Sequence, residues 1–279
     1  MRTAPRAVIA AVALFCFAAF GSGTSAAEGK AAQQDAVKTV ADTSAPGESP
    51  AGLPKMSDKD LQSLLDRLEN TLGKIRTLEA RFVQEKKLSI FRDIVKSEGL
   101  LVFQRPDRVR FEITEPFQSA IVTNGKSAAR YELVDGAWKK LDAVDAEVMA
   151  MVTGQICSWI EGRFREKSDV YEISALASTP VTVVLTPRNE RFRKYIEAIE
   201  LSLAPDETKV TAVTVREPGG DSTVMRFTHE RRDRDIPPEV FDVTAAAPVA
   251  VAGFDTQDGG AAEEDKPADK GTASDEAKN

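Results

Sequence analysis

Residues 97–126 read SEGLLVFQRPDRVRFEITEPFQSAIVTNGK, and this stretch decides the fold. Apolar side chains alternate with polar ones, first at Leu101 and Phe103 and then at Val109 and Phe111. A period of two is typical of β-strands with one buried face. Turn residues separate the strands, namely the Arg-Pro-Asp and Glu-Pro steps and the closing Asn-Gly pair, which favours a tight hairpin. The stretch therefore predicts a meander of short antiparallel strands.

Two helices are expected outside this meander, and the first of them is amphipathic. Ser57 is a good N-cap, acidic residues follow in the first turn, where the helix dipole favours them, and leucines recur at helical spacing over residues 61–75. From 144 to 162, apolar residues stand among small ones with very few charges. This second segment predicts a helix that is broken near Gly154.

The rest of the chain repeats the strand pattern. Further strands are expected at 80–88, 127–133, 137–141, 170–174, 181–186, 196–203, 209–215 and 223–229, with a short helical turn at 237–241. Strands and helices do not alternate regularly, which argues against a parallel sheet. We expect a mainly β (α+β) fold, a strongly curved antiparallel sheet with helices filling or covering its concave face.

The N-terminal segment has the features of a signal peptide. Arg2 and Arg6 make its start positive, residues 7–20 are apolar, and the small residues Ser25-Ala26-Ala27 offer a cleavage site. We expect residues 1–27 to be removed on export to the periplasm. An uncleaved membrane anchor is the alternative, because the uncharged span 7–27 is just long enough to cross a bilayer.

Two further segments lack the large apolar residues that a core needs. Residues 28–55 and 244–279 are rich in small and polar residues, so we expect a disordered linker and a disordered acidic tail. The tail holds eight acidic and three basic residues, a net charge of −5 out of the chain's −7. The remaining domain, 56–243, is therefore near neutral, which argues against a nucleic-acid-binding protein.

Little in the sequence supports catalysis. His229 is the one histidine, and Cys157 is the one cysteine outside the N-terminal apolar run, so no disulfide can form within the exported chain. A zinc site or a histidine-based triad is excluded, and no phosphate-binding loop or Gly-x-Ser-x-Gly motif is present. We interpret Cys157 as a buried small hydrophobe. The chain is expected to be a binding protein and not an enzyme, with no cofactor and no metal.

An ordered set of short motifs resembles the periplasmic outer-membrane lipoprotein carrier family, LolA. After the long helix come Phe82-Val83-Gln84, a strand from Gly99 to Arg105-Pro106, a strand ending in an aromatic at Phe111, Pro116, Asn124-Gly125, a methionine-bearing helix at 148–152, Leu185-Thr186-Pro187 and a terminal Phe241. The resemblance covers most of 56–243. Phe111 departs from the family, which often carries tryptophan there.

The resemblance implies an incomplete antiparallel β-barrel, a half-barrel whose lid helices cover a hydrophobic cavity. It implies a monomeric periplasmic carrier that ferries acylated lipoproteins or related lipids towards the outer membrane. Its partners would be this cargo, an inner-membrane donor complex and an outer-membrane acceptor. It also implies that Arg105, in the slot of an arginine associated with opening and closing of the lid, acts as a latch.

Inward apolar side chains are expected to form the wall of the acyl-binding cavity: Leu64, Leu68, Leu72, Phe82, Leu101, Phe103, Val109, Phe111, Ile121, Met149, Met151 and Val152. The alternative for each of them is ordinary core packing. The methionines favour a cavity, because this flexible side chain adapts to irregular contents.

Two other classes of function stay open. One is a periplasmic interaction or stress-signalling module with a similar half-barrel, which would bind a protein partner through an exposed apolar patch. The other is a hydrolase whose site carries no recognised motif, and the residue inventory above argues against it.

Overall fold

The computed structural model describes residues 53–90, 93–141 and 146–251, except for the side chains of residues 146–152 and 191. Contacts divide the chain into two units, 1–248 and 249–279, and the sheet and its helices belong to the first. The predicted signal peptide, nearly all of the predicted linker and the tail from residue 252 onward lie outside the described residues. Within the described ranges, no helix has both the length and the apolar character to cross a membrane.

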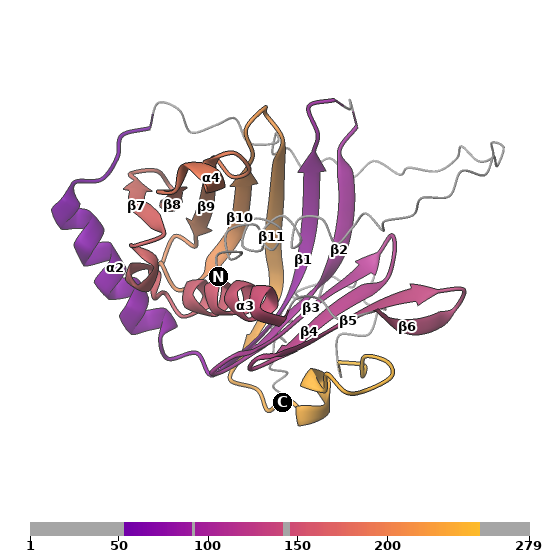
Figure 1. Ribbon diagram of the computed structural model, residues 1–279. Coiled ribbons are helices and arrows are strands. Elements are labelled where there is room, and N and C mark those ends of the chain that lie inside the picture. Colours follow the sequence, from indigo (N-terminus) through magenta and orange to yellow (C-terminus); the bar gives the residue numbers. More distant parts are fainter. Residues whose placement is uncertain (1–52, 91–92, 142–145, 252–279) are drawn as a thin grey trace, which may run out of the picture. The chain divides into compact units, whose positions relative to one another are not determined.

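The strands of the described chain form one antiparallel sheet (Figure 1). They are β1 (Thr77–Lys87), β2 (Val95–Gln104), β3 (Arg108–Glu115), β4 (Ser119–Asn124), β5 (Ser127–Val134), β6 (Ala137–Leu141), β7 (Tyr171–Leu176), β8 (Thr182–Pro187), β9 (Ala198–Leu203), β10 (Val210–Arg216) and β11 (Ser222–Arg232). Their order in the sheet is β6-β5-β4-β3-β2-β1-β11-β10-β9-β8-β7. Because β6 and β7 are its two edges, the curved sheet does not close into a barrel.

Two meanders make up the sheet, and they join at its centre. Strands β1–β6 follow one another in chain order, as the alternating pattern and its turns predicted, and β7–β11 do the same. The join is the pairing of β1 with β11, in which Phe82 lies opposite Phe227. The predicted mainly antiparallel, strongly curved half-barrel is confirmed.

The first helix, α2 (Asp58–Leu72), begins at Ser57, whose Oγ accepts a hydrogen bond from the backbone N–H of Asp60 at 3.2 Å. Its apolar stripe is buried, at Leu61, Leu64, Leu65, Leu68 and Leu72. The segment before it lies along the edge strand β7, where the Met56 N–H donates to the Ala175 carbonyl at 2.8 Å. The predicted N-cap and leucine stripe thus fix α2 at the β7 end of the sheet.

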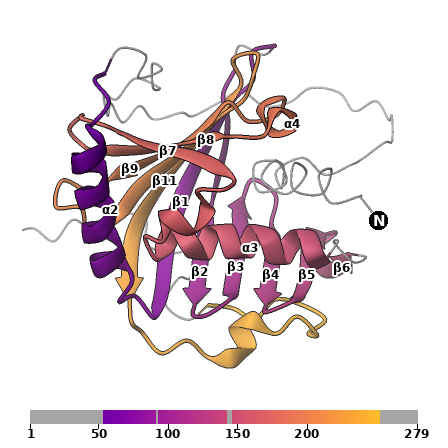
Figure 2. The ribbon, with the colours of Figure 1, turned by 60° about the vertical axis from the view of Figure 1, so that its left-hand side comes forward.

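The second helix, α3 (Ala146–Ile160), crosses the concave side of β2–β5 (Figure 2). It runs unbroken through Gly154, so the predicted break was wrong. A single glycine weakens a helix by only about 1 kcal/mol relative to alanine, and packing against the sheet offsets this. Shorter helices follow, namely α4 (Glu190–Arg193) and the 3₁₀ turns η1 (Phe164–Lys167) and η2 (Pro238–Phe241).

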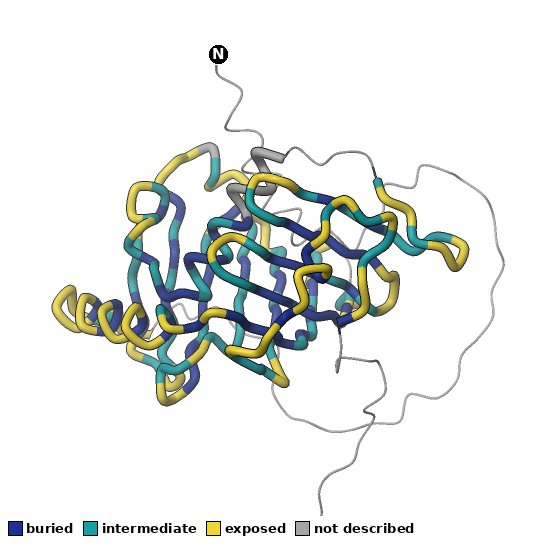
Figure 3. Tube along the Cα trace, turned by 90° about the horizontal axis from the view of Figure 1, so that it is seen from below, coloured by how far each residue is buried: buried dark blue, intermediate teal, exposed yellow. Residues whose placement is uncertain are grey.

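Packing on the concave face centres on two stacked rings. Phe82 and Phe111 lie parallel, with centroids 4.6 Å apart and planes 10° apart. Gly99, the cross-strand partner of Phe82, makes this possible, because a Cβ there would lie 2.5 Å from the Phe82 ring and 2.0 Å from the Glu112 carbonyl oxygen. Figure 3 shows buried stretches along the central strands and exposed turns between them.

Candidate functional site

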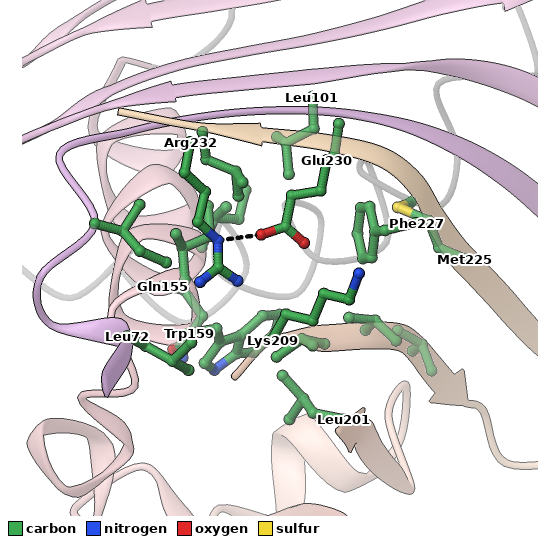
Figure 4. A pocket seen from close by; sticks show the side chains of 18 of the residues that line it. Leu72, Leu101, Gln155, Trp159, Leu201, Lys209, Met225, Phe227, Glu230 and Arg232 are labelled. Atoms are coloured by element: carbon green, nitrogen blue, oxygen red, sulfur yellow. Dashed lines mark hydrogen bonds and ion pairs between the residues drawn. The ribbon is translucent and has the colours of Figure 1, made fainter. Parts of the chain in front are cut away.

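A cavity of about 110 Å³ lies between the end of α2, the helix α3 and the inner face of the sheet (Figure 4). Its walls are almost entirely apolar. The apolar lining residues are Leu72, Ile75, Leu78, Ala80, Leu101, Ile156, Trp159, Ile160, Leu201, Val210, Val213, Val215, Met225 and Phe227. They come from β1, β2, β9, β10, β11 and both long helices, so the curvature of the sheet creates this space.

The two faces of α3 have different roles. One face carries Gln155 and Trp159, one turn apart, and both line the cavity. The other face is fixed to the sheet, where the Thr153 hydroxyl donates to the Thr123 hydroxyl of β4 at 3.0 Å and Cys157 is buried. The helix therefore both closes the cavity and is attached to the meander.

The chemistry of Cys157 is suppressed by its position. Burial, with a smaller contribution from the Glu161 carboxylate, raises the pKa of the thiol from 9.0 to about 12. The thiol stays protonated at neutral pH, and a protonated thiol is not a nucleophile. His229, the one histidine of the chain, is exposed on β11.

A bulge in β11 changes which residues face the cavity. Before the bulge, the cavity is lined by the odd-numbered residues Thr223, Met225 and Phe227. After it, the cavity is lined by the even-numbered residues Glu230 and Arg232. The pairing of β11 with β1 shifts between these two groups, and the intervening His229 has a φ of 51°. Because the bulge adds one residue to the strand, the side chains beyond it that face the cavity are the even-numbered ones and no longer the odd-numbered ones. Without it, the two charged side chains would lie on the convex face.

Charged residues gather at one side of the cavity. Glu230 and Arg232 form an ion pair, and Arg232 Nη2 also donates to the Thr208 carbonyl at 2.7 Å. Lys209 is exposed, so the cavity opens to solvent here. Figure 4 shows the three charged side chains with their polar ends towards the space that the apolar ones surround. This opening is therefore polar, while the interior is apolar.

The Phe-x-Gln motif places two residues on the concave face. Phe82 and Gln84 are both buried, and Gln84 is paired in register with Ser97 of β2. Lys86 continues the same face of β1 and is also buried. A row of buried polar residues therefore extends along β1, away from the stacked phenylalanines.

Arg105 lies directly after β2 and contacts the chain just beyond each long helix. Its guanidinium donates to the carbonyls of Gly73 and Ile75, both at 2.6 Å, in the segment that follows α2. Its Nε is also 3.4 Å from Oε1 of Glu161, the residue that follows α3. Arg105 thus connects the β2–β3 turn to the C-terminal ends of both helices.

Glu161 is the buried centre of this junction. Its side chain is 2% exposed, and its other oxygen forms an ion pair with Arg163 Nε at 2.5 Å. The ends of the helices touch beside it, because a Cβ on Gly162 would lie 2.6 Å from the Leu68 carbonyl oxygen. Gly162 also has a φ of 69°, which suits glycine at the end of a helix. One buried carboxylate therefore lies between two guanidinium groups where α2 meets α3.

The predicted cavity residues are distributed over the concave side. Leu72 and Leu101 line the cavity. Others belong to the packed core, namely Leu64, Leu68, Phe82, Phe103, Val109 and Phe111. Ile121 is buried on β4. Met149, Met151 and Val152 lie in α3, but their side chains fall outside the described residues.

Sequence reasoning missed the residues that line the cavity from the second meander. The alternation of Val213 with Val215, and of Thr223 with Met225, was a usable signal for one inward face. It did not reveal that α2 and α3 leave a space beside these strands. Trp159 was recognised as part of a helix but not as a wall of the cavity.

Comparison with known proteins gives one family. The model of the family described as outer membrane lipoprotein carrier protein LolA matches residues 73–244. The outer-membrane lipoprotein carrier protein of Proteus mirabilis (strain HI4320) is 25% identical over 111 residues, which are 38% of this chain and 55% of that protein. The chain thus spans about half the length of this curated relative.

Solved structures are more distant. A LolA superfamily protein from Nitrosomonas europaea has a TM-score of 0.36 at 10% identity, covering 65% of this chain and 96% of that one. The complex of MucA and MucB from Pseudomonas aeruginosa has a TM-score of 0.36 at 15% identity, covering 63% of this chain and 58% of the other.

Proposed function

The chain belongs to the LolA family of outer membrane lipoprotein carrier proteins, and from this premise we propose that it is a carrier without catalytic activity that binds acyl chains in the cavity under α3. The observation that carries the proposal is the cavity itself, an apolar space with a polar opening beside Lys209, Glu230 and Arg232. The cargo would be acylated lipoproteins or related lipids.

Hydrophobic burial supplies enough free energy for this role. Each methylene removed from water contributes about 0.8 kcal/mol. A chain of about fifteen carbons therefore gains on the order of 10 kcal/mol before ordering costs. An acyl chain can thus be held without any covalent bond or any charged contact.

The cavity must enlarge to accept a whole chain. An apolar cavity of about 150 Å³ holds a molecule the size of benzene, and this one measures about 110 Å³. It therefore accommodates the end of a chain, and deeper entry requires α3 to move away from the sheet. The described structure corresponds to a closed carrier in this proposal.

Arg105 and Glu161 would hold the carrier closed. Hydrogen bonds with one charged partner contribute about 1.5–3 kcal/mol each, and the partial exposure of Arg105 reduces their contribution. Two such bonds and a buried carboxylate are strong enough to set a balance between closed and open states. Entry of cargo can overcome them, because the free energy gained by acyl burial is larger.

The proposal places the protein in the periplasm as an exported monomer. An inner-membrane complex would load it, and an outer-membrane protein would receive the cargo. These partners follow from the family alone.

A variant with a filled cavity tests the proposal. Met225→Trp puts a larger side chain into the cavity from β11, whereas the matched control Val224→Trp puts the same side chain on the opposite face of that strand. We expect Met225→Trp to weaken the binding of a fluorescent fatty acid by about fivefold to 150-fold, because an acyl chain that enters a cavity already occupied by the indole overpacks it, at a cost of about 1–3 kcal/mol. Val224→Trp is expected to bind like the unmodified chain.

Thermal unfolding of both variants shows whether they remain folded. If the folded Met225→Trp variant binds the probe as tightly as the control, the acyl site lies elsewhere and this proposal is wrong.

A further inference from the structure

Three buried polar atoms at the cavity have no hydrogen-bond partner among the described residues. They are Gln155 Nε2, Trp159 Nε1 and Thr223 Oγ1, and all three residues line the cavity. Gln155 is 9% exposed and Thr223 is 2% exposed. Buried polar groups in folded proteins nearly always have partners, because leaving one unpaired loses the hydrogen bonds it makes with water. These atoms therefore indicate a ligand.

The chemistry of the three atoms selects what that ligand must offer. The Trp159 indole N–H can only donate a hydrogen bond, and the Gln155 amide nitrogen is likewise a donor. The Thr223 hydroxyl can donate as well. None of the three needs a donor from the ligand. The complementary ligand is therefore an apolar molecule that carries acceptor oxygens.

Two of the donors lie where an acyl chain would pass beneath α3. Gln155 and Trp159 are one helical turn apart on the face that closes the cavity, and Met225 and Phe227 of β11 lie across the space from them (Figure 4). Two cations line the same cavity. Arg232 is already paired with Glu230 and the Thr208 carbonyl, and Lys209 is exposed at the opening. The interior thus favours a neutral acceptor.

Resting on the proposed function, we infer that the cavity recognises an acyl ester, with Gln155 and Trp159 donating to the ester oxygens of the bound lipid. A chain joined through an ester brings a neutral carbonyl acceptor with its methylenes. An alkyl ether of the same length brings the methylenes without the carbonyl. The site distinguishes them by the donors that the ether leaves unpaired.

The test compares two probes that differ in this carbonyl alone, monopalmitoylglycerol and hexadecylglycerol, each displacing a fluorescent fatty acid from the full exported chain. We expect the ester to bind at least about fivefold more tightly than the ether, because one net hydrogen bond to a buried donor contributes a difference in affinity of this size. Gln155→Leu, of similar size and without donors, is expected to remove most of this preference by weakening ester binding while ether binding is kept.

Matched controls separate recognition from damage to the fold. Gln118→Leu makes the same change at an exposed position after β3, and it should leave both affinities unchanged. Trp159→Phe removes the indole N–H and retains a ring, so it tests the same inference if Gln155→Leu does not fold. It too is expected to reduce the preference for the ester.

The outcomes are distinct. Equal affinity of the unmodified chain for ester and ether overturns this inference and leaves acyl binding intact. Tighter binding of palmitate than of the ester also overturns it, since the acceptor would then be a carboxylate near Lys209. Failure of every probe to bind contradicts the proposed function itself.

Discussion

Replacing Phe82 with alanine is expected to lower the free energy of unfolding by about 3–5 kcal/mol, the range for a fully buried aromatic side chain. The Phe82 ring is 1% exposed and stacks on Phe111, and it fills the space that Gly99 leaves on the neighbouring strand. Its loss leaves a cavity at the centre of the sheet, beside the pairing of β1 with β11. Denaturant unfolding followed by circular dichroism measures the change.

Phe117→Ala is the matched control for this prediction. Its side chain is 73% exposed after β3, so its removal should change the free energy of unfolding by less than about 0.5 kcal/mol. Similar losses in the two variants would contradict the assignment of Phe82 to the centre of the core.

Replacing Glu161 with leucine is expected to lower the free energy of unfolding by about 3 kcal/mol. Removing one member of a buried ion pair costs about 3–5 kcal/mol. The lower end applies here, because Arg105 and Arg163 are each 35% exposed and can regain water. We also expect a bound fluorescent fatty acid to be released more slowly, because the loss of Glu161 weakens the closed state to which the carrier returns when its cargo leaves.

Glu166→Leu is the control, because Glu166 pairs with the same Arg163 at 2.8 Å but is 49% exposed. It should change stability by less than about 0.5 kcal/mol and leave the release rate unchanged. If Glu161→Leu loses stability but releases the probe at the unmodified rate, the junction is structural and does not control opening.

Local chemistry in the sequence was sufficient to predict the first meander, the individual strands of the second and the first helix. Alternation with turn residues at Asn124-Gly125 predicted a hairpin that the structure contains, and Ser57 with its leucines predicted α2. The pairing of β1 with β11 could not be derived in this way. Those strands are far apart in sequence, and their contact depends on curvature and packing.

The cavity shows the same limit. Arg105 was singled out from its position in a motif, and its contacts with Gly73 and Ile75 lie at the predicted end of α2. Glu161 was missed, because nothing in the sequence around a single carboxylate at the end of a helix indicates that it is buried. The bulge at His229 was likewise invisible, although it turns Glu230 and Arg232 towards the cavity. Such features arise from three-dimensional packing and not from local periodicity.

Native mass spectrometry of the full chain, exported to a bacterial periplasm and purified without detergent, tests the central claim most directly. The account predicts a population of the protein carrying the mass of an acyl lipid or a lipoprotein, and its loss in Met225→Trp but not in Val224→Trp. A folded protein that never carries lipid, or that carries a protein partner in its place, would contradict the account.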